Sequence, residues 1–167
     1  MRSSLFQERA AGIAAWLYAL WQARALGQAW RDSPFDRLGS VAFLLWCVPV
    51  LIKAGQRLPM RTVWFAVGVV FSLLGFVSEL NAVKYGGLAV VTCGFLPPTR
   101  ASWVQLAGAV SWMPALGWVL SSAISSISLR LPNLGDLLDP VTIVNGARLL
   151  IAALTVLIAL RPPAFLR

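Results

Sequence analysis

The feature that most constrains this chain is an apolar stretch near its C-terminus, Val141–Leu160, which contains a single arginine, Arg148. The part after the arginine, Leu149–Leu160, has only twelve residues, and a helix needs roughly 20 residues to cross the hydrocarbon core of a membrane. A membrane-spanning helix here must therefore include Arg148. A charge in that position costs about 2.5–3.5 kcal/mol on insertion scales and normally has a partner or lines a wet cavity. We expect other segments to cover this side chain.

Three more polar residues of the stretch fall on the same helix face as Arg148. Thr142, Asn145 and Thr155 are placed around it at steps of three, three and seven residues. Such steps bring side chains together on one side of a helix. We therefore predict that this face of the last helix points into the protein.

The composition predicts a membrane protein with a single transmembrane domain over residues 1–167. Hydrophobic residues make up 59% of the chain and charged residues 12%, which is not typical of a soluble domain. The apolar runs lack the two-residue alternation of barrel strands, so the predicted fold class is an all-α bundle of about six transmembrane helices. The expected spans are residues 10–26, 38–52, 62–78, 82–98, 102–122 and 141–160.

Local residue types refine these spans. Pro49 and Pro114 predict bends within two of them, and Leu131–Pro140 is expected to be a re-entrant or interfacial segment. Glycines in the third and fifth spans predict close packing of helices; they are Gly68, Gly75, Gly108 and Gly117. Six of the eight tryptophans fall in or near span ends, as at membrane interfaces; they are Trp16, Trp21, Trp30, Trp64, Trp103 and Trp118.

The distribution of charge predicts the orientation of the chain. With six spans, the side that holds both termini carries eight basic residues and one acidic residue, and the other side carries five of each. The positive-inside rule then places both termini in the cytoplasm of a multi-pass protein of the plasma membrane, which is the inner membrane in a bacterium. The net charge of +8 is explained by this topology, and we predict no binding of nucleic acid.

A set of polar residues on the outward side forms the candidate polar pocket: Glu79, Lys84, Asp136, Asp139, Asn145 and Arg148. The three acids of this set are the expected counter-ions of Arg148. The set allows a structural ion pair that locks the last helix to the third. It also allows a site for an anion or carboxylate that faces the outer compartment, or a contact with a partner chain.

The residue types of the chain limit its chemistry. The sequence has no histidine, which excludes a histidine general base or metal ligand from this chain alone. Cys47 and Cys93 both lie in apolar runs without Cys-x-x-Cys spacing, which is typical of inert buried thiols. We predict no cofactor and no metal site. Cys93 and Arg148 are the only candidates for catalytic residues.

In Trp30–Val50, a tryptophan is followed by Ser33-Pro34, Gly39 and a second tryptophan. This order resembles the early part of the exosortase/archaeosortase family of multi-spanning membrane transpeptidases, and Trp103–Leu120 resembles the span before the catalytic half of that family. Val144–Leu149 is similar to the Asn-x-x-Arg-Ile element that supplies the active-site arginine, and the resemblance implies that role for Arg148.

The chain also departs from that family at its catalytic positions. Leu38 stands where the family has a histidine in its Ser-His-Gly motif, and the Cys-Ser-Gly nucleophile motif is absent, with Cys93-Gly94 in its place. We therefore expect a truncated exosortase-like subunit or scaffold in the lipid bilayer. It would be non-catalytic alone and would act with another membrane protein or as a homo-oligomer. The alternatives are an exosortase-like cysteine transpeptidase or protease, and a small transporter or channel with an outward-facing polar pocket.

Overall fold

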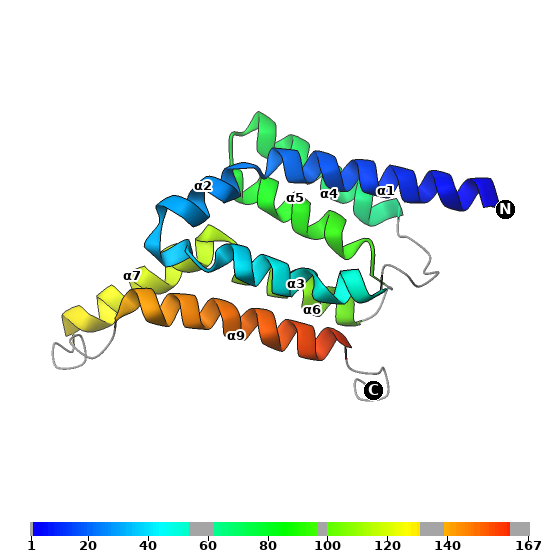
Figure 1. Ribbon diagram of the computed structural model, residues 1–167. Helices are drawn as coiled ribbons and strands as arrows, with labels where there is room; N and C mark the ends of the chain where they lie inside the picture. The colour runs from blue at the N-terminus through cyan, green and yellow to red at the C-terminus, as the bar shows by residue number, and fades with distance from the viewer. Residues whose placement is uncertain (1, 54–61, 97–99, 131–138, 161–167) are drawn as a thin grey trace.

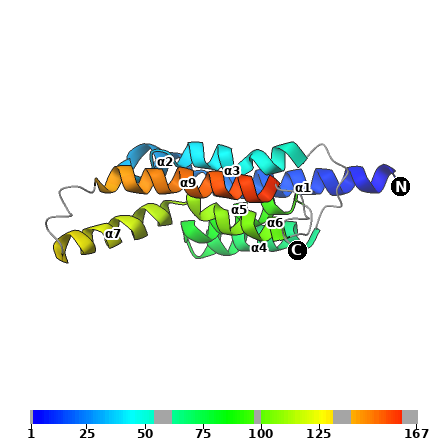
Figure 2. The same cartoon turned by 90° about the horizontal axis from the view of Figure 1, so that it is seen from below.

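The structure of the protein, a computed structural model, describes residues 2–53, 62–96, 100–130 and 139–160, and all regular elements within these ranges are helices. The helices run back and forth along one long axis and form an elongated bundle (Figures 1 and 2). The prediction of an all-α fold is confirmed.

The N-terminal part differs from the predicted span at 10–26. Helix α1 (Arg2–Gln22) begins earlier, and after a turn the chain continues as the short helix α2 (Ala25–Asp32). Helix α2 is amphipathic: Leu26 is buried, whereas Gln28 and Arg31 are exposed. Because only one of its faces is apolar, α2 lies across the end of the bundle and does not extend α1 (Figure 1).

Two stretches are long and apolar enough to cross a membrane, namely Pro34–Lys53 and Pro140–Leu160. The first contains the 3₁₀ turn η1 (Pro34–Asp36) and helix α3 (Gly39–Lys53), which continues through Pro49. The second is α9 (Pro140–Leu160), which packs along α3. A third candidate is a broken span formed by two helices with a 60° bend between them.

The broken span contains α6 (Arg100–Gly108), the 3₁₀ turn η2 (Ala109–Ser111) and α7 (Pro114–Arg130). The break directly precedes Pro114, which cannot donate a backbone hydrogen bond, so the predicted bend is confirmed. Helix α7 then diverges from the bundle (Figures 1 and 2). It extends past the predicted end at residue 122. In this part the Ser125 and Ser126 hydroxyls donate to backbone carbonyls four residues earlier, at 2.9 and 2.8 Å, so that these polar groups are satisfied within the helix.

Helices α4 (Thr62–Val77) and α5 (Asn81–Cys93) form a tight hairpin. Helix α4 is apolar but shorter than a full span, and neither α1 nor α5 is among the helices long and apolar enough to cross a membrane. The described residues thus contain two candidate spans, or three with the broken pair, and the count of six stays a prediction. The predicted re-entrant segment Leu131–Pro140 lies almost wholly outside the described residues.

Glycines allow the close approach of α4 and α5. A Cβ atom on Gly68 would lie 2.9 Å from the carbonyl oxygen of Gly87, and one on Gly87 would lie 2.8 Å from that of Gly68. Such distances are too short for any side chain, so the predicted packing role of Gly68 is confirmed. Small residues at helix contacts are the main device by which membrane helices approach one another.

An aromatic core joins α3 to the broken span. The buried rings of Trp46 and Trp112 lie 5.3 Å apart, and Phe43 packs against both. The Trp46 indole N–H donates to the backbone carbonyl of Gln105 at 2.6 Å, and the Gln105 amide donates back to the carbonyl of Trp46. Because both side chains are fully buried, these bonds satisfy polar groups that would otherwise be costly to hold away from water.

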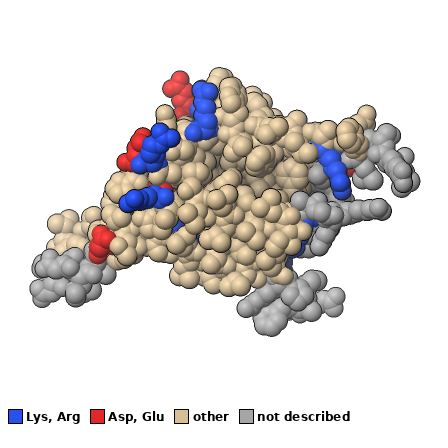
Figure 3. Space-filling view, in the orientation of Figure 1, with Lys and Arg blue, Asp and Glu red and all other residues tan. Residues whose placement is uncertain are grey.

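The surface of the protein is apolar between its ends. Most of the charged side chains visible in Figure 3 gather toward the two ends of the molecule, and a broad uncharged band lies between them. Helix α4 contributes large exposed apolar side chains to the surface, among them Val63, Leu74 and Val77, which is 80% exposed. Continuous apolar surface of this kind is uncommon on soluble monomers and suits contact with lipid.

Two adjacent glycines of α5 provide a matched test of the hairpin. A Cβ on Gly87 would meet backbone atoms of α4, whereas one on Gly86 would meet nothing within 4 Å. We expect Gly87→Ala to destabilise the protein by about 1–3 kcal/mol through overpacking. Gly86→Ala should be neutral or stabilising by about 0.4–1 kcal/mol. Unfolding by SDS titration in mixed micelles, followed by circular dichroism, measures both. Equal stabilities for the two variants would contradict this packing.

Candidate functional site

The polar face of α9 is buried as predicted. Asn145, Arg148 and Thr155 all point into the protein, and Arg148 is 0% exposed. Thr142 is the exception, because it lies exposed in the first turn of the helix. The buried face continues through Ala152, which belongs to the core.

The guanidinium of Arg148 is bonded on three sides by acceptors of this chain. Its Nε donates to the carbonyl of Phe35 at 3.1 Å, and its Nη1 donates to the carbonyls of Ser111 and Met113 at 2.8 and 3.0 Å. Its Nη2 forms an ion pair with the carboxylate of Asp36. An arginine has five N–H donors, so four of them are engaged in these bonds.

Interruptions in the helices supply the carbonyl acceptors. Ser111 and Met113 lie at the break between α6 and α7, and Phe35 lies in the 3₁₀ turn before α3. Carbonyl groups at such ends lack some of their intrahelical partners. Arginines inside membranes often pair with backbone carbonyls, and here the broken span provides them.

Asn145 forms hydrogen bonds on both sides of Asp36 in the chain. Its amide nitrogen donates to the carbonyl of Pro34 at 3.0 Å, and its amide oxygen accepts the backbone N–H of Leu38 at 3.1 Å. Asn145 and Arg148 are three residues apart and therefore project from one side of α9. Together they hold η1 and the start of α3 against the last helix.

Helix α7 approaches this cluster at a glycine. A Cβ on Gly117 would lie 2.6 Å from a carboxylate oxygen of Asp36 and 2.9 Å from Nη2 of Arg148. The predicted packing role of Gly117 is confirmed, and its position is now specific: it lets α7 close over the ion pair. The resulting Arg148 cluster consists of Phe35, Asp36, Ser111, Met113, Gly117, Asn145 and Arg148.

The prediction of the counter-ion of Arg148 was wrong for the two predicted acids that the structure describes, Glu79 and Asp139. The ion pair is made by Asp36, which is 6% exposed, and not by Glu79 or Asp139. Asp36 belongs to the loop between the first two predicted spans, which the predicted topology assigns to the same side as the predicted acids. That shared side was the only sequence signal for it, because spacing along one helix does not identify a partner on another segment.

The other residues of the predicted polar pocket lie elsewhere. Glu79 is exposed in the turn between α4 and α5, with a left-handed backbone (φ 57°), and the stem of Lys84 lies against Gly75. Asp136 falls outside the described residues. No hydrogen bond or ion pair of a described residue joins Glu79 or Lys84 to Arg148. Of the described members of that set, the structure brings together only Asn145 and Arg148.

Asp139 caps the start of α9. Its carboxylate accepts the backbone N–H groups of Val141 and Thr142 at 3.2 and 3.1 Å, and also the Thr142 hydroxyl. These hydrogen bonds, that of the Thr142 side chain most of all, lower the pKa of Asp139. An acidic cap of this kind stabilises a helix N-terminus.

Cys93 lies at the end of α5 and is only 1% exposed, within the hydrophobic core. It and the half-buried Cys47 are free thiols, and the bonds of Arg148 go to oxygen acceptors. Among the described residues, no three acidic, cysteine or histidine side chains are grouped in a way that could hold a metal ion.

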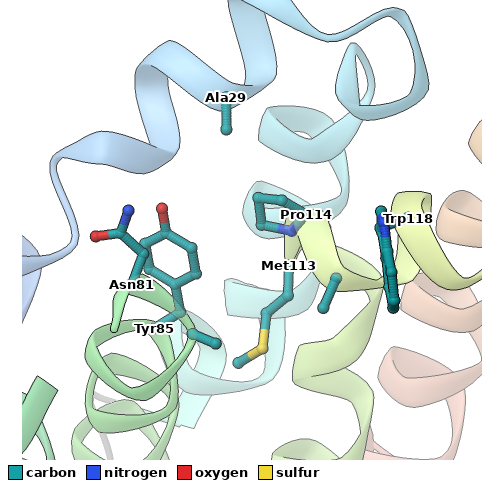
Figure 4. Close-up of a pocket in the computed structure, with 8 residues that line it drawn as sticks. Ala29, Asn81, Tyr85, Met113, Pro114 and Trp118 are labelled. Atoms are coloured by element: carbon teal, nitrogen blue, oxygen red, sulfur yellow. The ribbon is translucent and has the colours of Figure 1, made fainter. Parts of the chain in front are cut away.

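A cavity that the sequence did not predict lies beside the Arg148 cluster. It has a volume of about 410 Å³ and lies between α2, α5 and the start of α7 (Figure 4). Its lining is Ala29, Asn81, Ala82, Tyr85, Met113, Pro114, Ala115 and Trp118. Met113 belongs to both places, because its carbonyl accepts from Arg148 and it also lines the cavity.

Comparison with known proteins returned no match to a family model, to a curated protein or to a solved structure. The resemblance to exosortases therefore stays a prediction that depends on the residues quoted above.

The ion pair can be tested with one matched pair of carboxylate variants. Asp36→Asn keeps the shape of the side chain but leaves a buried guanidinium without its counter-charge, which typically costs about 3–5 kcal/mol. Asp32→Asn changes an exposed carboxylate close by in the chain and should change the stability by less than about 0.5 kcal/mol. SDS-titration unfolding measures both free energies.

A double-mutant cycle then isolates the pair itself. We expect Asp36→Asn combined with Arg148→Met to lose less stability than the sum of the two single variants, because each single variant leaves a partner unpaired. Additive losses would show that the two side chains do not interact.

Proposed function

We propose that this chain is a multi-pass integral membrane protein that acts as a non-catalytic subunit or scaffold together with a membrane partner. The observation that carries this proposal is the closed environment of Arg148. Its guanidinium is fully buried, and four of its donors are bonded to acceptors of this chain. A catalytic or anion-binding arginine must offer donors to its ligand, whereas this one joins segments of its own fold.

Membrane integration is supported by several features together. Pro34–Lys53 and α9 are long and apolar enough to span a bilayer, and the side of α4 that faces away from the bundle is apolar. The start of α1 and the end of α9 lie at the same end of the bundle in Figure 1, which suits an even number of passes with both termini in the cytoplasm.

An exosortase-like cysteine enzyme is the less favoured alternative. Such an enzyme needs a thiolate and a group that generates it. Cys93 is buried in an apolar core, and the chain contains no histidine to act as its base. A transporter that uses Arg148 to bind its solute is disfavoured for the reason already given, because the guanidinium is bonded internally.

We place the partner contact on the outer part of α7. This helix leaves the bundle after the bend (Figure 2), and beyond Gly117 only Ile124 is buried. Its exposed apolar side chains include Ile127 and Leu129, which is 86% exposed. The partner is either another membrane protein or a second copy of this chain.

Purification in mild detergent tests the proposal. We expect one stoichiometric partner, or a defined homo-oligomer, detected by native mass spectrometry. The double variant Ile127→Ala and Leu129→Ala should reduce the retained partner at least several-fold, because it removes the apolar contact. A matched control, Val63→Ala and Val77→Ala on α4, should retain it. A monomer without a partner would contradict the proposal, as would cleavage or transfer of a sorting-signal peptide by the chain alone.

The topology is tested by labelling with a membrane-impermeant maleimide. In a variant with Cys47→Ala and Cys93→Ala, a single cysteine at Gln7→Cys should be protected in intact cells and react only after lysis. One at Glu79→Cys should react from outside. Both positions are exposed, so accessibility within the protein does not limit either reaction. The reverse labelling pattern would contradict cytoplasmic termini.

A further inference from the structure

We propose that the cavity between α2, α5 and α7 binds one membrane lipid, with an acyl chain in its apolar part and the polar glycerol–ester region at Asn81 and Tyr85. This site is independent of the partner contact on the outer part of α7. The proposal depends on the origin of the cavity, on its chemistry and on its size.

The cavity exists because the broken span bends. Helix α7 leaves the bundle at an angle of 60° to α6, and Pro114 at the bend forms part of the wall. Helix α2 lies across the same end of the bundle and contributes Ala29 (Figures 1 and 4). The space is thus bounded by three helices and lies where the apolar body of the protein meets its charged end.

The lining matches an amphipathic ligand. Most of it is apolar: Met113, Pro114, Ala115 and Trp118 form the part contributed by the broken span. Asn81 and Tyr85 offer an amide and a hydroxyl group, and Trp118 adds an indole N–H. In Figure 4 the polar ends of Asn81 and Tyr85 lie on the opposite side of the pocket from Trp118. An apolar pocket with a few polar groups gathered at one place is the usual design of a small-molecule site.

The size selects a lipid chain over a protein segment. A volume of about 410 Å³ is in the range of small-ligand pockets, whereas an α-helix with its side chains is about 10–12 Å across. Trp118 is exposed beside the cavity, and tryptophans are typical of the boundary between lipid tails and headgroups. A chain can therefore enter from the bilayer while its ester groups remain at that boundary.

Photo-crosslinking tests the site directly. The purified protein is reconstituted in vesicles of phosphatidylcholine and phosphatidylglycerol that contain phosphatidylcholine with a diazirine on its acyl chain. After irradiation, labelled residues are identified by mass spectrometry. We expect Met113 and Trp118 to be labelled at least fivefold more than Val70 and Leu74, which are exposed apolar residues of α4.

Two alanines of α7 provide a matched pair of variants. Ala115 lines the cavity and Ala123 does not, and both are exposed, so neither substitution fills the core. We expect Ala115→Phe to reduce the labelling of Met113 at least fivefold, and Ala123→Phe to leave it unchanged. Tyr85→Phe keeps the apolar shape and should reduce the amount of lipid that remains bound in native mass spectrometry.

Two results would overturn the proposal. Labelling of the cavity residues no higher than on α4 would mean that only the lipid surrounding the protein is near them. Protection of the cavity residues by a second copy or a partner chain would mean that a protein side chain occupies the space. In either case Tyr85→Phe would leave lipid retention unchanged.

Discussion

The structure depends on the need to satisfy one buried guanidinium. Taking an arginine out of water is expensive, and attraction to a single carboxylate offsets that expense only when hydrogen bonds satisfy the remaining donors. Arg148 meets this condition with acceptors from two separate segments. One segment precedes α3 and provides Phe35 and Asp36. The other is the break between α6 and α7, which provides Ser111 and Met113. Residues more than a hundred positions apart in the chain are held together as a result.

The break between α6 and α7 serves this cluster and also shapes the surface. A continuous helix would keep the carbonyls of Ser111 and Met113 within its own hydrogen-bond ladder. The interruption before Pro114 leaves the carbonyl of Ser111 available to Arg148, and the carbonyl of Met113 accepts both from Arg148 and from the backbone N–H of Leu116 at 3.2 Å. The same interruption turns α7 by 60° away from α6. That turn opens the cavity against α5 and exposes the outer part of α7. One irregular segment therefore has three consequences: it helps to satisfy the buried charge, it opens the cavity, and it exposes the proposed partner surface.

The sequence predicted features that depend on local pattern. The buried face of α9 follows from helical spacing, the bend at Pro114 follows from the missing N–H, and the role of Gly68 follows from its small size. The counter-ion could not be predicted in this way, because five of the six acidic residues were assigned to one side of the membrane and spacing does not rank loops by distance. Helix α2 was missed because its composition is that of a polar loop. The part of α7 after residue 122 was not predicted, because a serine-rich sequence is more typical of a linker than of a helix.

The environment of Arg148 also defines what a catalytic function would require. Four N–H groups of its guanidinium are engaged in the bonds described and one is not. A ligand could reach the four bonded groups only if Asp36 or the carbonyls at the break moved away. Such a movement would uncover a charge within the helix bundle, and Gly117 leaves no space for a ligand beside the ion pair while α7 stays in place. A reaction that uses Cys93 would in addition need a deprotonated thiol, and Cys93 lies in an apolar core. Catalysis would thus need both a rearrangement around Arg148 and a deprotonated thiol, whereas a structural role needs neither, and this difference supports the structural role proposed above.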